Sequence, residues 1–358
     1  MGEEAAIPTA AALGALERRA REILPTGVYD FFAGGAGSEA TVVANAAAWA
    51  ELELRPRVLR NVSAVDLSVD LLGARLAAPI VVAPMAAHRL AHPDGELATA
   101  RAVAAAGGLL VISTRAGTTL ADIAAAAPTA HRWFQVYLMR DRGWTAELAA
   151  EARATGCSAL VLTVDTPVVG TKLRASQAAF EIPAEVWMVN RSGRTSGAAD
   201  AEEQDASIGL DAIAWLHDVS GGLPVVVKGV VRADDAHACI EAGAAAIVVS
   251  NHGGRQLDGA VATARALPEV VEAAAGRVDV YVDGGLRSGA DILRALALGA
   301  RAVMIGRPIL WGLACGGRQG VESVLADLDA QLREAAALAG AATLDQITPD
   351  LIFGSRAH

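Results

Sequence analysis

Short apolar runs rich in Val and Ile alternate with alanine-rich helical segments along the 358 residues. This alternation is typical of a parallel sheet built from βα units. We count eight units in about 250 residues, which is the size of a (β/α)8 TIM barrel. The alternative, a doubly wound sheet, usually has a glycine fingerprint after its first strand, but Pro84, Met85 and Ala86 stand there instead. The sequence therefore predicts an α/β barrel.

Each predicted strand is a short run of the kind that is buried on both faces. The eight runs span residues 78–85, 109–115, 132–138, 159–165, 224–230, 245–251, 278–285 and 301–307. Helices are predicted at 94–108, with Asp94 as N-cap, and at 145–156, 233–243, 289–300 and 320–340, each closing on or beside glycine.

Further segments fall outside the repeat. Residues 1–77 form an N-terminal extension with a helix predicted at 13–25, and residues 166–209 insert a polar stretch after the fourth strand. An insertion on a βα loop lies over the barrel mouth, so we expect a mobile lid or a disordered loop. We expect one domain, with the barrel core at 78–318 and a C-terminal helical region at 319–358.

Composition excludes several classes of function. The net charge of -10 argues against nucleic-acid binding. No apolar stretch reaches the roughly 18 residues of a membrane span, and the acidic N-terminus does not resemble a targeting peptide. Cys157, Cys239 and Cys315 are far apart and odd in number, which indicates reduced thiols in a cytoplasm. None of them has the spacing of a metal ligand to a second Cys or His.

Polar residues stand at the ends of nearly all predicted strands, where the chemistry of a barrel gathers. They are Ser113 and Arg115, Gln135 and Tyr137, Thr163 and Asp165, Lys228, Ser250 to Arg255, Asp283 to Arg287, and Gly306 with Arg307. A purely structural barrel would not need lysine and arginine there, so the pattern predicts a site at the mouth.

The last two strand ends predict a phosphate cradle. Gly284, Gly285 and Gly306 leave backbone amides bare, and Arg287 and Arg307 add guanidinium groups beside helix starts. Lys228, at the end of an apolar strand, would stabilise negative charge in the mouth. Gln135 and Thr163 would suit the edge of a planar heterocycle.

His252 and Arg255 share one glycine-rich loop. With an ordinary pKa of about 6.5, His252 would act as a base near neutral pH, and Asp165 would hold the imidazolium. Arg255 would grip a carboxylate with two hydrogen bonds. Together these features predict a phosphorylated cofactor beside an acidic substrate.

The strings "SNHGGRQLDG" (250–259), "VKGV" (227–230), "LTVDTP" (162–167), "DGGLRSG" (283–289) and "IGRP" (305–308) resemble the FMN-dependent α-hydroxy acid oxidase/dehydrogenase family. The resemblance runs from about Leu24 to the C-terminus. The stretch "YDFFAGGAGSEATVVAN" (29–45) is more similar to the hydroxymandelate oxidase branch than to glycolate oxidases.

The resemblance implies an FMN site in the barrel mouth. The ring would contact Pro84, Met85, Ala86, Ser113, Gln135, Thr163, Lys228 and Ser250, and the phosphate would contact Asp283, Gly284, Gly285, Arg287, Gly306 and Arg307. His252 would remove a proton as the substrate α-carbon is oxidised, with Asp165 holding it. Arg255 would bind the carboxylate and Tyr137 would hydrogen-bond the substrate.

Three positions depart from the family pattern. Phe31 stands where glycolate oxidases have a tyrosine, and Lys172 stands where the family has a second substrate-binding arginine. Lysine keeps the charge but loses the planar fork, and Arg174 is another residue that would reach in. Arg115 replaces a tryptophan of the plant enzymes and would be either a replacement cation or a solvated side chain.

The implied function is FMN-dependent oxidation of a 2-hydroxy acid to the 2-oxo acid, with electrons passed to O2 or another acceptor. The N-terminal resemblance favours an aryl, mandelate-like substrate. The alternative is oxidation of an amine or a biosynthetic intermediate by the same scaffold, prompted by the altered carboxylate site. The family also implies a homotetramer.

Overall fold

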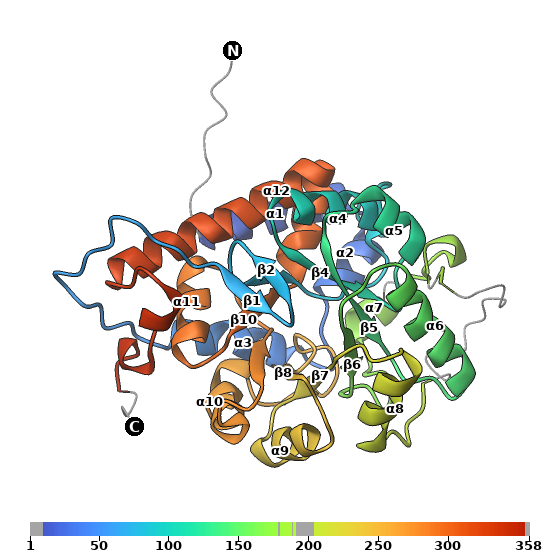
Figure 1. Cartoon of the computed structure of the whole chain (residues 1–358). Helices are drawn as coiled ribbons and strands as arrows, with labels where there is room; N and C mark the ends of the chain where they lie inside the picture. The colour runs from blue at the N-terminus through green and yellow to red at the C-terminus, as the bar shows by residue number, and fades with distance from the viewer. Residues whose placement is uncertain (1–9, 178–179, 188, 191–203, 355–358) are drawn as a thin grey trace.

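The computed structural model describes residues 10–177, 180–187, 189–190 and 204–354. Eight parallel strands close a barrel in the order β10-β3-β4-β5-β6-β7-β8-β9, with helices around its outside (Figure 1). The strands are β3 (Ile80–Val82), β4 (Leu109–Ser113), β5 (His131–Val136), β6 (Leu160–Thr163), β7 (Val225–Val230), β8 (Ala246–Val249), β9 (Asp279–Val282) and β10 (Ala302–Ile305). The predicted (β/α)8 barrel is confirmed.

The helices follow the strands in the expected rhythm. Those of the barrel layer are α4 (Gly95–Ala105), α5 (Leu120–Ala126), α6 (Arg142–Ala154), α8 (Asp211–Val219), α9 (Ala233–Glu241), α10 (Thr263–Ala274), α11 (Gly289–Ala297) and α12 (Arg307–Leu338). The N-terminal extension contains α1 (Ala10–Ile23), α2 (Thr26–Ala33) and α3 (Ala40–Ala50). The helix predicted at 13–25 corresponds to α1, whereas α2 and α3 were not predicted.

Two helix termini differ from the prediction. The last helix was expected at 320–340 and corresponds to the part of α12 that follows Gly317. The first part of α12 starts at Arg307 directly after β10 and was not predicted, and the backbone is non-helical at Gly316 and Gly317 between the two parts. Asp94 precedes α4 as expected, but its side chain accepts no capping hydrogen bond because its backbone is already helical.

An antiparallel hairpin closes the end of the barrel opposite the mouth. Its strands β1 (Val69–Leu71) and β2 (Ala74–Leu76) pair Val69 with Leu76. The hairpin packs against side chains of the barrel interior and lies across the strands in the view of Figure 1. Because the packed side chains are apolar, they exclude water from the barrel interior at the end opposite the mouth.

The insertion 166–209 is described in part. It contains α7 (Leu173–Gln177) and a 3-10 turn at Ala184–Val186. Most of the polar stretch for which we expected a lid or a disordered loop, 191–203, lies outside the described residues.

The described helices include none with the length and apolar character required to cross a membrane. Cys157 and Cys239 are buried and Cys315 is half-buried, and all three are free thiols.

Candidate active site

Alternation along the barrel strands decides which side chains face the mouth. Successive side chains point to opposite faces, and the inward ones, such as Trp133, Val161 and Val226, form one apolar layer in the barrel. Two residues further along six of the eight strands, the same alternation turns polar groups inward. These groups are Ser113, Gln135, Thr163, Lys228, Ser250 and Asp283.

A cavity of about 660 Å³ opens above this layer. Most of the predicted site residues line it, namely Phe31, Pro84, Met85, Ala86, Ser113, Gln135, Tyr137, Thr163, Lys172, Lys228, His252, Arg255, Asp283, Gly284, Gly285, Arg287, Gly306 and Arg307. Asp165 and Ser250 lie directly behind lining residues, as shown by their bonds to His252. The structure therefore brings the predicted residues of every strand end to one cavity.

His252 is positioned by an acid partner and by its own backbone. Its Nδ1 lies 2.9 Å from Asp165 Oδ1, and its backbone N–H donates to Ser250 Oγ at 3.0 Å. Asp165 packs tightly on β7, because a Cβ on Gly229 would lie 2.7 Å from Asp165 Cβ. The pairing orients the imidazole so that Nε2 is the nitrogen left for a substrate.

The electrostatics of this pair favour a neutral histidine, which is the form that can accept a proton. Desolvation lowers the pKa of His252 below its ordinary value, while Asp165 opposes the shift. Burial acts to raise the pKa of Asp165, but His252 and Lys228 lower it on balance. Asp165 therefore stays ionised and can stabilise the imidazolium that forms when His252 takes a proton.

Lys228 is a buried cation in a hydrogen-bonded network. Its Nζ donates to Ser250 Oγ at 2.9 Å and pairs with Asp283 Oδ2 at 3.1 Å. Burial acts to lower the pKa of Lys228, but Asp283 and Asp165 raise it overall. Lys228 therefore remains charged and presents positive potential to the cavity.

Two buried polar atoms at this wall lack a hydrogen-bond partner among the described residues. Gln135 accepts with its Oε1 from Ser113 Oγ and from Thr114 N, both at 3.2 Å, and its Nε2 is left without an acceptor. Asp283 Oδ1 is likewise unpartnered. Buried polar groups are normally satisfied, so both atoms indicate a polar ligand in the cavity.

The loop after β9 leaves room only for glycine. Gly285 has a φ of 84°, and a Cβ there would lie 2.5 Å from the carbonyl carbon and oxygen of Asn45 on α3. Trp49 Nε1, also on α3, donates to Gly284 O at 2.8 Å. The unpredicted helix α3 thus supports the predicted phosphate loop from outside.

The same helix supports the histidine loop. Asn45 and Asn251 exchange side-chain amide hydrogen bonds of 2.9 and 2.8 Å, and both are buried. Asp258 accepts from the backbone N–H groups of Ser38 at 2.7 Å and Thr41 at 3.1 Å, and so caps α3 from a distant part of the chain. Residues of the string "SNHGGRQLDG" therefore include supports as well as reactive groups, a division that the sequence pattern did not reveal.

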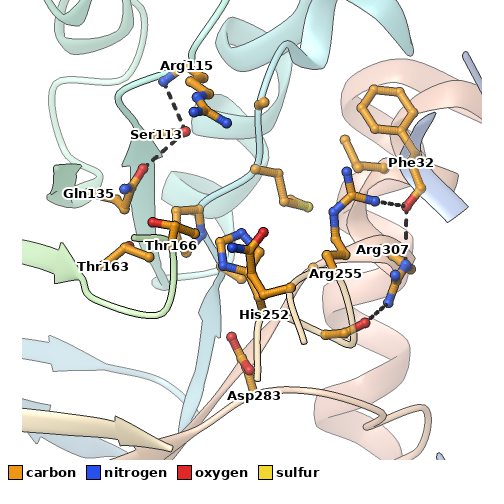
Figure 2. A pocket seen from close by; sticks show the side chains of 18 of the residues that line it. Phe32, Ser113, Arg115, Gln135, Thr163, Thr166, His252, Arg255, Asp283 and Arg307 are labelled. Atoms are coloured by element: carbon orange, nitrogen blue, oxygen red, sulfur yellow. Dashed lines mark hydrogen bonds between the residues drawn. The ribbon is translucent and has the colours of Figure 1, made fainter. Parts of the chain in front are cut away.

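Arg307 makes contacts that the sequence did not predict. Its guanidinium donates to the carbonyl oxygens of Phe32 at 3.1 Å, Gly253 at 3.0 Å and Gly34 at 3.0 Å, as Figure 2 shows in part. Burial lowers the pKa of Arg307, and the charges of Arg255 and Arg287 lower it further. Positive charge therefore accumulates here, which favours a bound anion.

The substrate side of the cavity carries Arg255 and Lys172. Arg255 Nη1 donates to Phe31 O at 2.8 Å and Gly34 O at 2.7 Å, which leaves other guanidinium N–H groups for a carboxylate. Lys172 Nζ donates to Gly170 O at 2.9 Å. Burial, together with the charges of Arg255 and Arg115, lowers the pKa of Lys172 to about 8.

Arg174, the alternative to Lys172, and Arg115 are the two other cations whose positions the sequence left open. The expectation that Arg174 would reach in is wrong, because it pairs with Glu39 and Asp30 and does not line the cavity. Arg115 does line it, with its guanidinium 4.7 Å from the centre of the Tyr137 ring. Arg115 therefore lies at the cavity, whereas the sequence left its position open.

These features fit FMN. The unpartnered Gln135 amide matches the hydrogen-bond acceptors of an isoalloxazine edge, and the bare amides after β9 match a phosphate. The free Asp283 oxygen matches ribityl hydroxyls better than the phosphate expected from the resemblance, because two anions repel each other. Across the described ranges, no group of three or more His, Cys, Asp or Glu side chains could hold a metal ion. A barrel with this mouth belongs to the class of flavin-dependent oxidoreductases.

Comparison with known proteins gives the family. The FMN-dependent dehydrogenase family matches residues 20–353. The chain is 42% identical over 360 residues to human 2-hydroxyacid oxidase 1, covering 97% of each protein. It is 44% identical over 343 residues to 4-hydroxymandelate oxidase from Amycolatopsis orientalis, covering 93% of this chain and 95% of that one. A crystal structure of mandelate oxidase superimposes with a TM-score of 0.89 at 42% identity, covering 94% and 96% of the two chains.

The chain therefore belongs to the FMN-dependent dehydrogenase family. This confirms the predicted resemblance, the cofactor FMN, and an oxidoreductase that acts on the CH–OH group of 2-hydroxy acids. The alternative of amine oxidation is not favoured, because the relatives named here are hydroxy acid oxidases.

Proposed function

We propose that the protein oxidises an aryl 2-hydroxy acid to the corresponding 2-oxo acid at FMN, with O2 as electron acceptor. The observation that carries the proposal is the His252–Asp165 pair, at 2.9 Å, on the same cavity as Arg255. Oxidation at an α-carbon needs a base beside that carbon and a cation on the neighbouring carboxylate. Both are supplied by one loop.

Bound FMN would supply the acceptor for the two electrons that leave the substrate. The residues proposed to hold it are Pro84, Met85, Ala86, Ser113, Gln135, Thr163, Lys228, Ser250, Asp283, Gly284, Gly285, Arg287, Gly306 and Arg307. Lys228 would stabilise negative charge at the ring edge. The backbone amides after β9 and the start of α12 would hold the phosphate.

On the substrate side, Arg255 and Lys172 would hold the α-carboxylate and Tyr137 would donate a hydrogen bond to the substrate. His252 Nε2 would accept the proton released as the α-carbon is oxidised. Asp165 would stabilise the resulting imidazolium and keep Nε2 directed at the substrate. Loss of two electrons and two protons converts the hydroxy acid to the oxo acid; His252 would take one proton, and the electron pair together with the other proton would pass to bound FMN.

An aryl substrate is supported by the ring-rich side of the cavity. Phe31 and Trp187 both line it, with ring centres 6.5 Å apart in an edge-on arrangement. Such edges favour packing against another aromatic ring. Two of the relatives named above are a mandelate oxidase and a 4-hydroxymandelate oxidase, which is consistent with this preference.

We also propose a single FMN-binding domain that forms a cytoplasmic homotetramer. The family resemblance supports the assembly, and the three free thiols support a reducing compartment. Light scattering of the purified holoenzyme would give four times the chain mass, and a monomer would contradict the assembly.

The test of function is an anaerobic titration of the holoenzyme with glycolate, lactate, mandelate and 4-hydroxymandelate, following flavin absorbance. We expect the aryl acids to bleach the flavin at the lowest concentrations and the colour to return on admitting air. Bleaching without return in air would indicate a dehydrogenase. A flavin that no hydroxy acid bleaches would refute the proposal.

A further inference from the structure

Arg115 and Arg255 reach the cavity from opposite sides. Arg115 follows β4 and Arg255 follows β8, and these strands stand across the eight-stranded barrel from each other. Arg255 is anchored to carbonyl oxygens at the end of α2. Arg115 lies over the Tyr137 ring at 4.7 Å and the Trp187 ring at 5.4 Å. Figure 2 shows the two guanidinium groups well separated.

The neighbours of Arg115 fix its side chain without neutralising it. The Gln204 amide satisfies both of its polar atoms in one orientation. In that orientation Oε1 accepts from Arg115 Nη2 at 2.5 Å and Nε2 donates to Thr166 O at 2.8 Å. Arg115 Nε is buried without a hydrogen-bond partner in the described part of the chain. No described carboxylate pairs with Arg115.

The cavity therefore holds more positive charge than one substrate carboxylate can offset. Arg255, Lys172 and Arg115 all line it, and Arg115 lowers the pKa of both others. Glu181 is the acidic residue of the described insertion that lines the cavity, and it is exposed. Lys228 is already paired with Asp283. An α-carboxylate on Arg255 and Lys172 would leave the charge of Arg115 unmatched on the opposite side.

We infer that Arg115 recognises the side chain of the substrate, and that the preferred substrate is an aryl 2-hydroxy acid with a second, anionic group on its ring. This inference rests on the proposed function. The ring would pack against the side of the cavity formed by Phe31 and Trp187, and a ring carboxylate would accept hydrogen bonds from Arg115. A phenolic hydroxyl at the same place would also accept a hydrogen bond from the guanidinium, but it carries no negative charge and cannot bind with two parallel hydrogen bonds, so its interaction is weaker.

The test compares matched substrates on matched variants. Mandelate and its 3- and 4-carboxy derivatives differ only in the ring carboxylate. Arg115→Met removes the charge at similar length, and Arg115→Lys keeps it. Arg174→Met is the control, because Arg174 is on the same insertion as Lys172 but pairs with Glu39 and Asp30 outside the cavity.

We expect kcat/KM of the wild type to favour a carboxymandelate over mandelate by at least about tenfold, the effect of one charge-assisted hydrogen bond. Arg115→Met should abolish this preference, because it should lower kcat/KM for the carboxymandelates at least about tenfold more than for mandelate. Arg115→Lys should retain part of the preference, and Arg174→Met should leave the ratio unchanged.

Binding provides a readout that is independent of turnover. Benzoylformate and carboxybenzoylformate, the 2-oxo products, would perturb the flavin absorbance and give dissociation constants with the same ratio. Equal losses for both ligands in Arg115→Met would overturn the inference, because Arg115 would then serve the shared α-carboxylate or the fold. If no hydroxy acid is oxidised, the proposed function fails, and the ratio of dissociation constants still decides the role of Arg115.

Discussion

Lys172 gives the sharpest prediction of pH dependence. Burial and the charges of Arg255 and Arg115 lower its pKa to about 8 in the free site. A group with this pKa is roughly nine-tenths protonated at pH 7 and roughly one-tenth protonated at pH 9. If the protonated lysine is needed to hold the α-carboxylate, kcat/KM should fall about tenfold between these pH values.

The perturbation is Lys172→Arg, which keeps the charge at every accessible pH because arginine does not deprotonate. The wild type should show an alkaline limb in kcat/KM near pH 8, and kcat should be less affected because the bound carboxylate keeps the lysine protonated. The acid limb, set by His252, should lie below pH 6.5 because desolvation lowers that pKa.

The assay is steady-state oxygen uptake with mandelate from pH 5.5 to 9.5 for wild type, Lys172→Arg and Lys172→Met. In Lys172→Arg the alkaline limb of kcat/KM near pH 8 should disappear. In Lys172→Met, kcat/KM at pH 7 should be about tenfold lower than in the wild type and should not fall further at alkaline pH. An unchanged limb near pH 8 in Lys172→Arg would refute the reasoning.

The supports of the site make three more predictions. Asp165→Asn should lower kcat by about 10²-fold or more, because the imidazolium loses its anionic partner. The dissociation constant of benzoylformate, followed by flavin absorbance, should stay near the wild-type value. A parallel loss of benzoylformate binding would contradict this prediction. Gly285→Ala places a Cβ 2.5 Å from the Asn45 backbone at a φ of 84°, so FMN affinity measured by fluorescence should fall, at a cost of about 1–3 kcal/mol. Gly276→Ala is its control, since that glycine also has positive φ but open space around it, and an equal loss of FMN there would argue against the clash. Asn45→Ala leaves the backbone N–H of Thr263 without its side-chain acceptor and removes the two hydrogen bonds between Asn45 and Asn251. Urea unfolding should therefore show about 1–3 kcal/mol less stability; unchanged stability would contradict the supporting role of α3.

Much of the site could be predicted because the barrel imposes a simple rule. Side chains alternate along a strand, so the residue two positions after an inward apolar one also faces inward. Gln135 follows Trp133 in this way and Lys228 follows Val226, and both line the cavity. Predicting the strands therefore also predicted which polar side chains line the cavity.

The supports could not be predicted because they depend on long-range contacts between neutral groups. Asn45 and Asn251 are 206 positions apart, and neither carries a periodic or charged signal. The strands of the hairpin β1–β2 have three residues each, too short for a pattern. The direction of Arg307 depends on which carbonyl oxygens the end of α2 leaves free, and the sequence does not specify this.

The most direct test of the account is single-turnover flavin reduction by 4-hydroxymandelate, under anaerobic conditions, in wild type and His252→Gln. We predict that one equivalent of substrate bleaches one equivalent of wild-type flavin and yields one equivalent of the 2-oxo acid. His252→Gln should bind benzoylformate with nearly the wild-type dissociation constant and reduce its flavin at least about 10²-fold more slowly. Reduction at the wild-type rate in that variant would show that His252 is not the base.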